Sequence, residues 1–254
     1  MIQHRPLQPA RADLPTMYDL PSEDPEEMGL PDEFHDFQPD LLRETCHPPA
    51  CQQFFVGADL NLYYDLNHTA WYKRPDWFLV LGVPASQTGD EMRWSYVLWQ
   101  EGIAPFLIVE LLSPGTEAED LGQTLRVVGR PPTKWQVYEQ ELQVPYYVVF
   151  DRFVNDFRLF RLTAGRYAEV EVGAEGFWFS ELQLSLGKWS GRYMGVDTQW
   201  LRWFDQFHEL IPTEQERAKQ AEQRAQQAEQ QVQQAGQRAE RLAAQLRALG
   251  IEPE

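Results

Sequence analysis

Apolar residues are concentrated between about residues 53 and 212, and both ends of the chain are poor in them. Within this middle part, three continuous apolar runs predict strands that are buried on both faces, because such strands need no polar side. These runs span residues 77–83, 106–112 and 144–150. Alternating or aromatic stretches predict further strands at residues 54–65, 94–99, 157–162, 167–172 and 182–189.

Two helical segments interrupt these strands. Thr116 and Glu119 have the spacing of a helix capping box. Thr133 follows Pro131-Pro132 and predicts the start of a second helix. Strands that alternate with helices and are followed by more strands favour an α/β fold with a mixed central sheet, which we assign to residues 51–212.

Residues 1–50 are rich in Pro, Asp and Glu and show little periodicity. Low hydrophobicity with high net charge prevents a segment from burying enough apolar surface to fold alone. We therefore expect residues 1–50 to form an acidic, Pro-rich N-terminal arm that is extended or partly disordered.

Residues 213–254 differ again, being rich in Ala, Gln, Glu and Arg. Their apolar residues recur at gaps of three and four in an unbroken heptad register, which predicts a long helix of roughly 55 Å. We expect a coiled coil that joins two copies into a homodimer through residues 213–249. A single solvated helix is the alternative, since the seam is mostly alanine and Gly236 weakens helix propensity. The seam positions are Ala218, Ala221, Ala225, Ala228, Val232, Ala235, Ala239, Leu242, Leu246 and Leu249.

The net charge of −17 limits the classes of partner. Residues 51–212 carry 13 basic and 21 acidic side chains, so the predicted domain is itself acidic. This charge opposes non-specific binding to a phosphate backbone. An enzyme acting on nucleic acid would need a local basic groove, metal ions or a second subunit.

The two cysteines, Cys46 and Cys51, flank His47 and two prolines. A zinc site would need a further Cys or His pair at ligand spacing, and none follows, so we expect reduced thiols in a cytosolic protein. No secretory signal is apparent and no apolar run reaches the roughly 18 residues of a membrane span. We therefore expect a cytoplasmic protein without membrane contact.

Candidate chemistry lies at Asp76, Glu110 and Lys134. Asp76 enters one buried run, Glu110 lies within another, and Lys134 begins the second predicted helix. Two carboxylates can hold a divalent cation that activates water against a phosphodiester, and an ammonium beside them can neutralise charge on the phosphate. The simpler alternatives are a turn residue at Asp76, an arginine partner for Glu110 and a solvent-facing Lys134.

Several segments together resemble the Uma2 family of restriction-endonuclease-like proteins. That family is abundant in cyanobacteria and belongs to the PD-(D/E)XK nuclease superfamily. The resemblance covers roughly residues 53–190. It rests on Gly57-Ala58-Asp59-Leu60-Asn61-Leu62-Tyr63-Tyr64-Asp65, Trp71-Tyr72-Lys73-Arg74-Pro75-Asp76, Trp99-Gln100-Glu101-Gly102, Val109-Glu110-Leu111-Leu112-Ser113-Pro114-Gly115-Thr116, Lys134-Trp135-Gln136-Val137-Tyr138 and Val144-Pro145-Tyr146-Tyr147.

The resemblance implies an αβββαβ nuclease core and Mg²⁺-dependent hydrolysis of DNA phosphodiesters, with Mn²⁺ as a substitute. It implies that Asp76 and Glu110 are metal ligands. The family pattern departs at Leu112, which stands where the superfamily has a lysine. Lys134, on the following helix, is the implied replacement.

Two functions follow from these observations. The first is a Mg²⁺-dependent DNA endonuclease with Asp76, Glu110 and Lys134 as catalytic residues. The second is a catalytically weak or inactive nuclease-fold protein that serves as a binding or assembly module through its coiled-coil tail. The second is motivated by the acidic domain, the acidic arm and Leu112.

Overall fold

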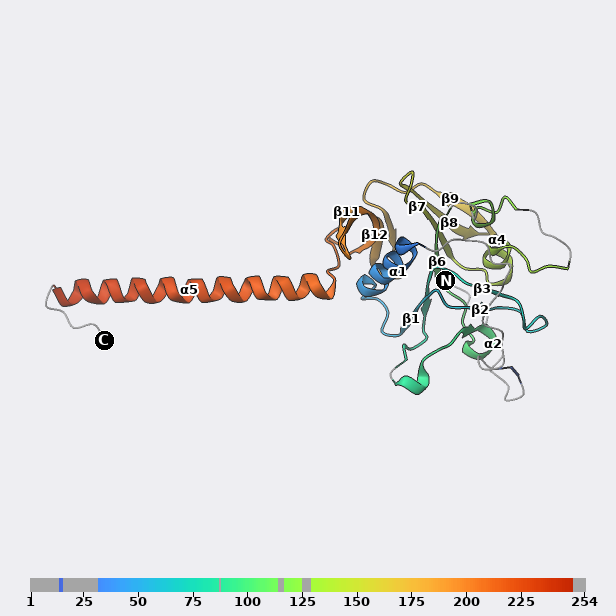
Figure 1. The fold of residues 1–254 in the computed structure, drawn as a ribbon. Coiled ribbons are helices and arrows are strands. Elements are labelled where there is room, and N and C mark those ends of the chain that lie inside the picture. Colours follow the sequence, from blue (N-terminus) through green and yellow to red (C-terminus); the bar gives the residue numbers. More distant parts are fainter. Residues whose placement is uncertain (1–13, 16–31, 87, 114–116, 125–128, 249–254) are drawn as a thin grey trace. The chain divides into compact units, whose positions relative to one another are not determined.

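The computed structural model describes residues 14–15, 32–86, 88–113, 117–124 and 129–248 (Figure 1). The chain divides into two compact units, Met1–Ile211 and Pro212–Glu254. The first unit contains all the described strands, and the second contains the long helix α5, Glu214–Ala248. No described helix is both long and apolar enough to cross a membrane.

A six-stranded mixed sheet forms the centre of the first unit, in the order β1-β4-β6-β7-β8-β9. Only β6 and β7 are parallel neighbours within it; the other adjacent pairs are antiparallel. Two parallel strands need a crossover connection, and here the crossover carries α3 (Glu117–Asp120), α4 (Lys134–Gln136) and η2 (Val137–Glu141). The mixed α/β fold predicted from the sequence is therefore confirmed. The strands are β1 Phe54–Ala58, β4 Trp77–Leu81, β6 Leu107–Leu111, β7 Tyr146–Asp151, β8 Asp156–Thr163 and β9 Arg166–Val170.

Alternate residues of the central strands enter two different hydrophobic cores. Trp77 and Val109 belong to one core, whereas their neighbours Phe78 and Ile108 belong to the other. Because side chains alternate across a strand, Glu110 lies on the same face as Ile108. This is the face on which the crossover packs, since Val137 of η2 lies in the second core.

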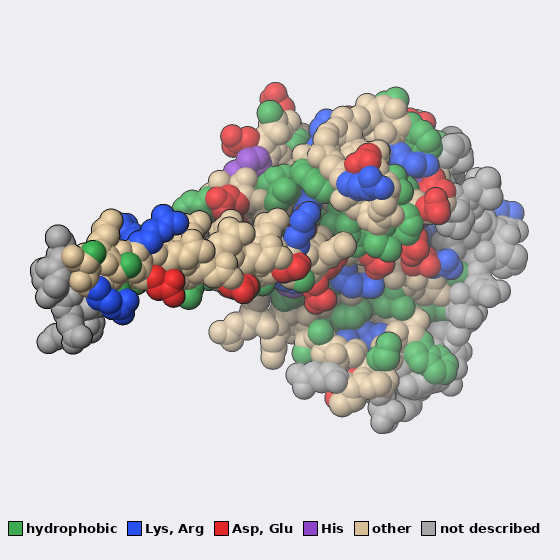
Figure 2. All heavy atoms as spheres, turned by 60° about the vertical axis from the view of Figure 1, so that its left-hand side comes forward, with side chains coloured by type: hydrophobic (Ala, Val, Ile, Leu, Met, Phe, Trp, Pro, Cys, Tyr) green, Lys and Arg blue, Asp and Glu red, His purple; other side chains and the backbone are tan. Residues whose placement is uncertain are grey.

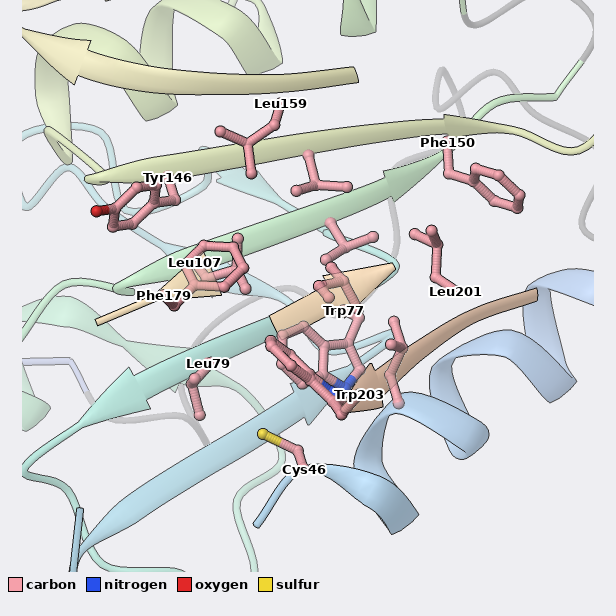
Figure 3. Close-up of a cluster of buried hydrophobic side chains, with 14 of the residues drawn as sticks. Cys46, Trp77, Leu79, Leu107, Tyr146, Phe150, Leu159, Phe179, Leu201 and Trp203 are labelled. Carbon is pink, nitrogen blue, oxygen red and sulfur yellow. The ribbon is translucent and has the colours of Figure 1, made fainter. Parts of the chain in front are cut away.

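The first core is closed by α1 and by a three-stranded antiparallel sheet, β10-β11-β12. Figure 3 shows Trp77 of the central sheet meeting Trp203 of β12, and their ring centroids lie 6.0 Å apart. Cys46, which follows α1, is buried in the same core. The bounds are α1 Glu33–Thr45, β10 Phe177–Phe179, β11 Leu184–Tyr193 and β12 Val196–Phe204.

Helix α1 lies within the segment expected to be an extended arm, so that expectation does not hold for residues 33–45. The Asp32 side chain caps the helix by accepting hydrogen bonds from the backbone N–H groups of Phe34 and His35. The helix buries Phe34, Leu41 and Leu42 in the first core. Residues 1–13 and 16–31 of the predicted arm lie outside the described residues.

The second core is covered by α3, α4 and η2, and by a small sheet in the order β3-β2-β5. Thr133 caps α4 in a reciprocal capping box with Gln136, as the sequence predicted. The strand predicted over residues 94–99 is shorter than expected, because α2 begins at Leu98. The bounds are β2 Leu62–Tyr63, β3 Tyr72–Lys73, η1 Gly89–Glu91, β5 Tyr96–Val97, α2 Leu98–Glu101, α3 Glu117–Asp120, α4 Lys134–Gln136 and η2 Val137–Glu141.

Helix α5 begins with a second capping box. The Glu216 backbone N–H donates to Thr213 Oγ1 at 3.1 Å, and the Thr213 N–H donates to Glu216 Oε2 at 2.8 Å. Beyond this first turn nearly every described side chain is exposed, including Val232 and Leu242 of the heptad seam. Figure 2 shows basic and acidic side chains along the helix. Coiled-coil pairing stays a prediction.

Candidate active site

Asp76 lies directly before β4, at the point where pairing between β4 and β6 ends. Its Oδ2 accepts a hydrogen bond from the Leu111 backbone N–H at 2.6 Å. Burial raises the pKa of the Asp76 carboxyl, although Lys134 and the Leu111 amide act in the opposite direction. Asp76 is thus a carboxylate fixed against β6 rather than an exposed turn residue.

Glu110 is fully buried on the crossover face of β6. Its Oε2 lies 3.0 Å from Lys134 Nζ, and its Oε1 accepts a hydrogen bond from the Tyr138 hydroxyl at 2.7 Å. Burial raises the pKa of Glu110 to about 7, and nearby Asp76 adds to the rise while Lys134 opposes it. The partner of Glu110 is therefore a lysine and not an arginine.

Lys134 is the first residue of α4, where the Thr133 capping box fixes the direction of the helix. Its side chain is only 17% exposed, which excludes the solvent-facing alternative. Its Nζ contacts Glu110 at 3.0 Å and Asp120 Oδ1 at 3.3 Å. Burial alone would lower the pKa of Lys134, but the surrounding carboxylates raise it well above its ordinary value, so the group is an ammonium ion.

Asp120 is an acid of this cluster that the sequence did not single out. It ends α3, and its side chain is 2% exposed. Its backbone carbonyl accepts a hydrogen bond from the Tyr147 hydroxyl on β7 at 2.9 Å. Only the tertiary fold brings Asp120 to Lys134, because no spacing pattern in the sequence links them.

Glu119 also contributes to this cluster. Thr116, its expected capping partner, lies outside the described residues. Glu119 Oε1 accepts from the Lys134 backbone N–H at 3.2 Å and lies 3.3 Å from Lys73 Nζ. Burial works to raise the pKa of Glu119, but Lys73 and the Lys134 amide together hold it below its ordinary value. Glu119 therefore ties β3 to the start of α4.

His35 reaches the site from α1. Its Nε2 lies 3.0 Å from the Leu111 carbonyl oxygen, and its Nδ1 lies 2.9 Å from Asp32 Oδ1. The two backbone polar groups of Leu111 are thus bonded by side chains, the N–H by Asp76 and the carbonyl by His35. No pattern in the sequence pointed to His35, because its segment was expected to be an arm.

The donor set at Asp76 and Glu110 fits a divalent cation. Both groups are carboxylates with raised pKa values, so a cation would compensate the cost of ionising them together. Mg²⁺ is usually held by one or two carboxylates, with water and substrate phosphate as further ligands. Within the described ranges, no group of three or more His, Cys, Asp or Glu is arranged to hold a metal.

The cysteines lie apart from this chemistry. Cys46 is buried, Cys51 is half-buried, and both are free thiols. Burial raises the pKa of each thiol. Neither belongs to a metal-binding group among the residues that the structure describes.

The element order and the site define a class of protein. Helix α1, strands β1, β4 and β6, the α4 crossover and β7 follow the αβββαβ order, and two acids and a lysine meet on the crossover face. This is a restriction-endonuclease-like α/β protein. The chain belongs to the Uma2 family, whose description reads "Putative restriction endonuclease" and whose sequence pattern matches residues 12–195. No curated protein matches the chain.

Proposed function

We propose that the protein is a Mg²⁺-dependent endonuclease that hydrolyses DNA phosphodiester bonds at Asp76, Glu110 and Lys134. Membership of a restriction-endonuclease-like family supports a nuclease. The observation that carries the proposal is the 3.0 Å contact between Glu110 on β6 and Lys134 on α4. This contact brings the Lys134 ammonium to the Glu110 carboxylate, although Leu112, two residues further along the chain, has only an apolar side chain.

Each residue has a distinct part in this proposal. A divalent cation at Asp76 and Glu110 would supply a water of lowered pKa and compensate phosphate charge. The Leu111 N–H fixes Asp76, and the Tyr138 hydroxyl fixes Glu110. Lys134 would donate to the phosphate oxygens on which negative charge develops.

Plasmid cleavage tests this proposal. Wild-type protein with Mg²⁺ or Mn²⁺ should nick or linearise supercoiled DNA, and Asp76→Ala and Glu110→Ala should lose about 100-fold or more of that activity. Asp197→Ala is the control, because this β12 acid has a side chain that is 71% exposed. Equal cleavage by all four proteins would refute the site assignment.

An inactive assembly module is the second candidate, and the exposed seam of α5 favours it. Calorimetric titration with Mg²⁺ separates the two functions. The endonuclease requires binding that disappears in Glu110→Gln, whereas the module requires no binding by either protein.

We also propose that α5 joins two copies of the chain as a parallel, in-register dimer. Arg217 and Arg224 directly precede seam alanines, and Glu222 and Glu229 directly follow them. In a parallel pair each such arginine meets the glutamate five residues further along the other copy, Arg217 with Glu222 and Arg224 with Glu229. An antiparallel pair would place arginine near arginine and glutamate near glutamate. Charge complementarity therefore supports a second copy of the chain in a parallel arrangement.

Sedimentation equilibrium of the full chain tests the dimer. Arg217→Glu with Arg224→Glu should weaken association by about tenfold or more, because four attractive pairs become repulsive. Adding Glu222→Arg and Glu229→Arg should restore it. A wild-type monomer at tens of micromolar would contradict the parallel dimer. So would a variant with all four substitutions that does not recover association.

A further inference from the structure

Lys134 has two carboxylate partners where one would satisfy its charge. Glu110 lies 3.0 Å from the ammonium and Asp120 lies 3.3 Å from it. Both carboxylates are almost entirely buried, and Asp76 adds a third negative group nearby. Buried acids in excess of their counter-charges are costly, so Asp120 calls for an explanation beyond a simple ion pair.

The segment that carries Asp120 is firmly attached to α4 and β7. The Tyr147 hydroxyl donates to the Asp120 carbonyl, and Glu119 accepts from the Lys134 backbone N–H. Gly122 packs so closely on Trp135 that an added Cβ would lie 2.7 Å from the indole ring. The consecutive acids Glu119 and Asp120 therefore hold Lys134 at its two ends, the first at the backbone and the second at the ammonium.

A divalent cation at Glu110 would disturb this arrangement. The cation and the Lys134 ammonium would compete for the same carboxylate, and like charges repel. Lys134 would then have to leave Glu110 while its side chain remains largely buried. Asp120 is the carboxylate already within reach of the displaced ammonium.

We propose that Asp120 is a positioning residue that holds the Lys134 ammonium in the site when Glu110 binds a divalent cation. Lys134 contacts both acids in the structure, and it would pass to Asp120 if a cation took Glu110. Asp120 thereby lowers the cost of cation binding and keeps Lys134 beside the bound phosphate. This inference rests on the proposed function of Asp76 and Glu110.

A direct ligand role for Asp120 would also weaken cation binding on mutation, so the experiment must separate the two. Mn²⁺ binding is measured by calorimetry on the full chain for wild type, Asp120→Asn, Lys134→Met and the double variant. Asp120→Asn should weaken binding about tenfold when Lys134 is present. In the Lys134→Met background, the same change should have almost no effect, because there is no ammonium to hold.

Matched controls secure the interpretation. Glu139→Gln removes another buried acid, which pairs with Arg166 outside the site, and should leave Mn²⁺ affinity unchanged. Asp120→Glu should recover most of the lost affinity. Lys134→Gln replaces Lys134→Met if the latter does not fold, as judged by circular dichroism.

Each outcome decides something. Equal weakening by Asp120→Asn in both backgrounds makes Asp120 a direct ligand and overturns the inference. An unchanged affinity in Asp120→Asn overturns it while leaving the proposed function intact. Absence of Mn²⁺ binding in the wild type overturns both.

Discussion

The Lys134 cluster and helix α5 use the same kinds of charged residue in opposite surroundings. In the cluster, Glu110 and Asp120 are at most 1% exposed, and both contact the Lys134 ammonium. Along α5 beyond its first turn, the acids and arginines are exposed to water. A buried charge that loses its partner remains uncompensated, whereas an exposed charge is solvated at once. The same substitution should therefore have very different effects in the two regions.

Removal of the lysine gives the largest expected difference. Lys134→Ala removes the ammonium that Glu110, Asp120 and Asp76 surround. The loss should destabilise the protein by about 3 kcal/mol near pH 8. Lys219→Ala in α5 should cause no measurable change. Urea unfolding of both variants checks this, and similar unfolding midpoints would show that the cluster tolerates its acids without the ammonium.

Dependence on pH gives the next largest difference. Burial raises the pKa of folded Glu110 from its ordinary 4.5 to about 7, so the folded state holds a proton that the unfolded state releases earlier. The resulting stabilisation is complete below the ordinary pKa and is lost as pH rises through about 7, at up to roughly 1 kcal/mol per pH unit.

Glu110→Gln should remove this part of the pH dependence of the unfolding free energy. Glu240→Gln, an exposed α5 acid outside the proposed interhelical pairs, is the matched control and should keep the wild-type profile. If the Glu110→Gln profile between pH 5 and pH 8 coincides with that of the wild type, Glu110 is not the titrating group.

The two capping boxes give the smallest but most closely matched difference. Thr133 caps α4 and Thr213 caps α5 with the same spacing. Thr133→Ala should lower global stability by about 1 kcal/mol, because η2, which continues α4, buries Val137 and Tyr138 in the second core. Thr213→Ala should reduce helicity at the start of α5, seen by circular dichroism, without moving the unfolding midpoint of the first unit. Equal shifts would mean that α5 and the first unit unfold together.

The sequence was most informative where apolar side chains determine the structure. The runs around Trp77, Leu107 and Tyr146 became β4, β6 and β7, and the strands predicted at residues 157–162 and 167–172 became β8 and β9. Strand β12 was not predicted. It follows β11 through a hairpin turn at Met194 and Gly195, which both have the positive φ angles typical of such turns. Helix α1 was missed because its acidic residues and Pro39 outweigh its few apolar positions.

The candidate site shows the same limit. Asp76, Glu110 and Lys134 could be selected from family motifs, and the structure brings them to one place. Asp120 and His35 could not be selected, because their contacts join residues from separate elements. A crossover connection and a helix packed on the opposite side create these contacts, and neither leaves a local pattern in the chain.

One consequence follows from the bonding of Leu111. Beyond Val109, β6 no longer pairs with β4, and the side chains of Asp76 and His35 hydrogen-bond the Leu111 backbone in place of a neighbouring strand. A ligand that draws the Asp76 carboxylate toward itself weakens the hydrogen bond between that carboxylate and the Leu111 N–H. The hydrogen–deuterium exchange rate of the Leu111 amide should therefore report ligand binding at the site. This measurement needs no label, substrate or turnover.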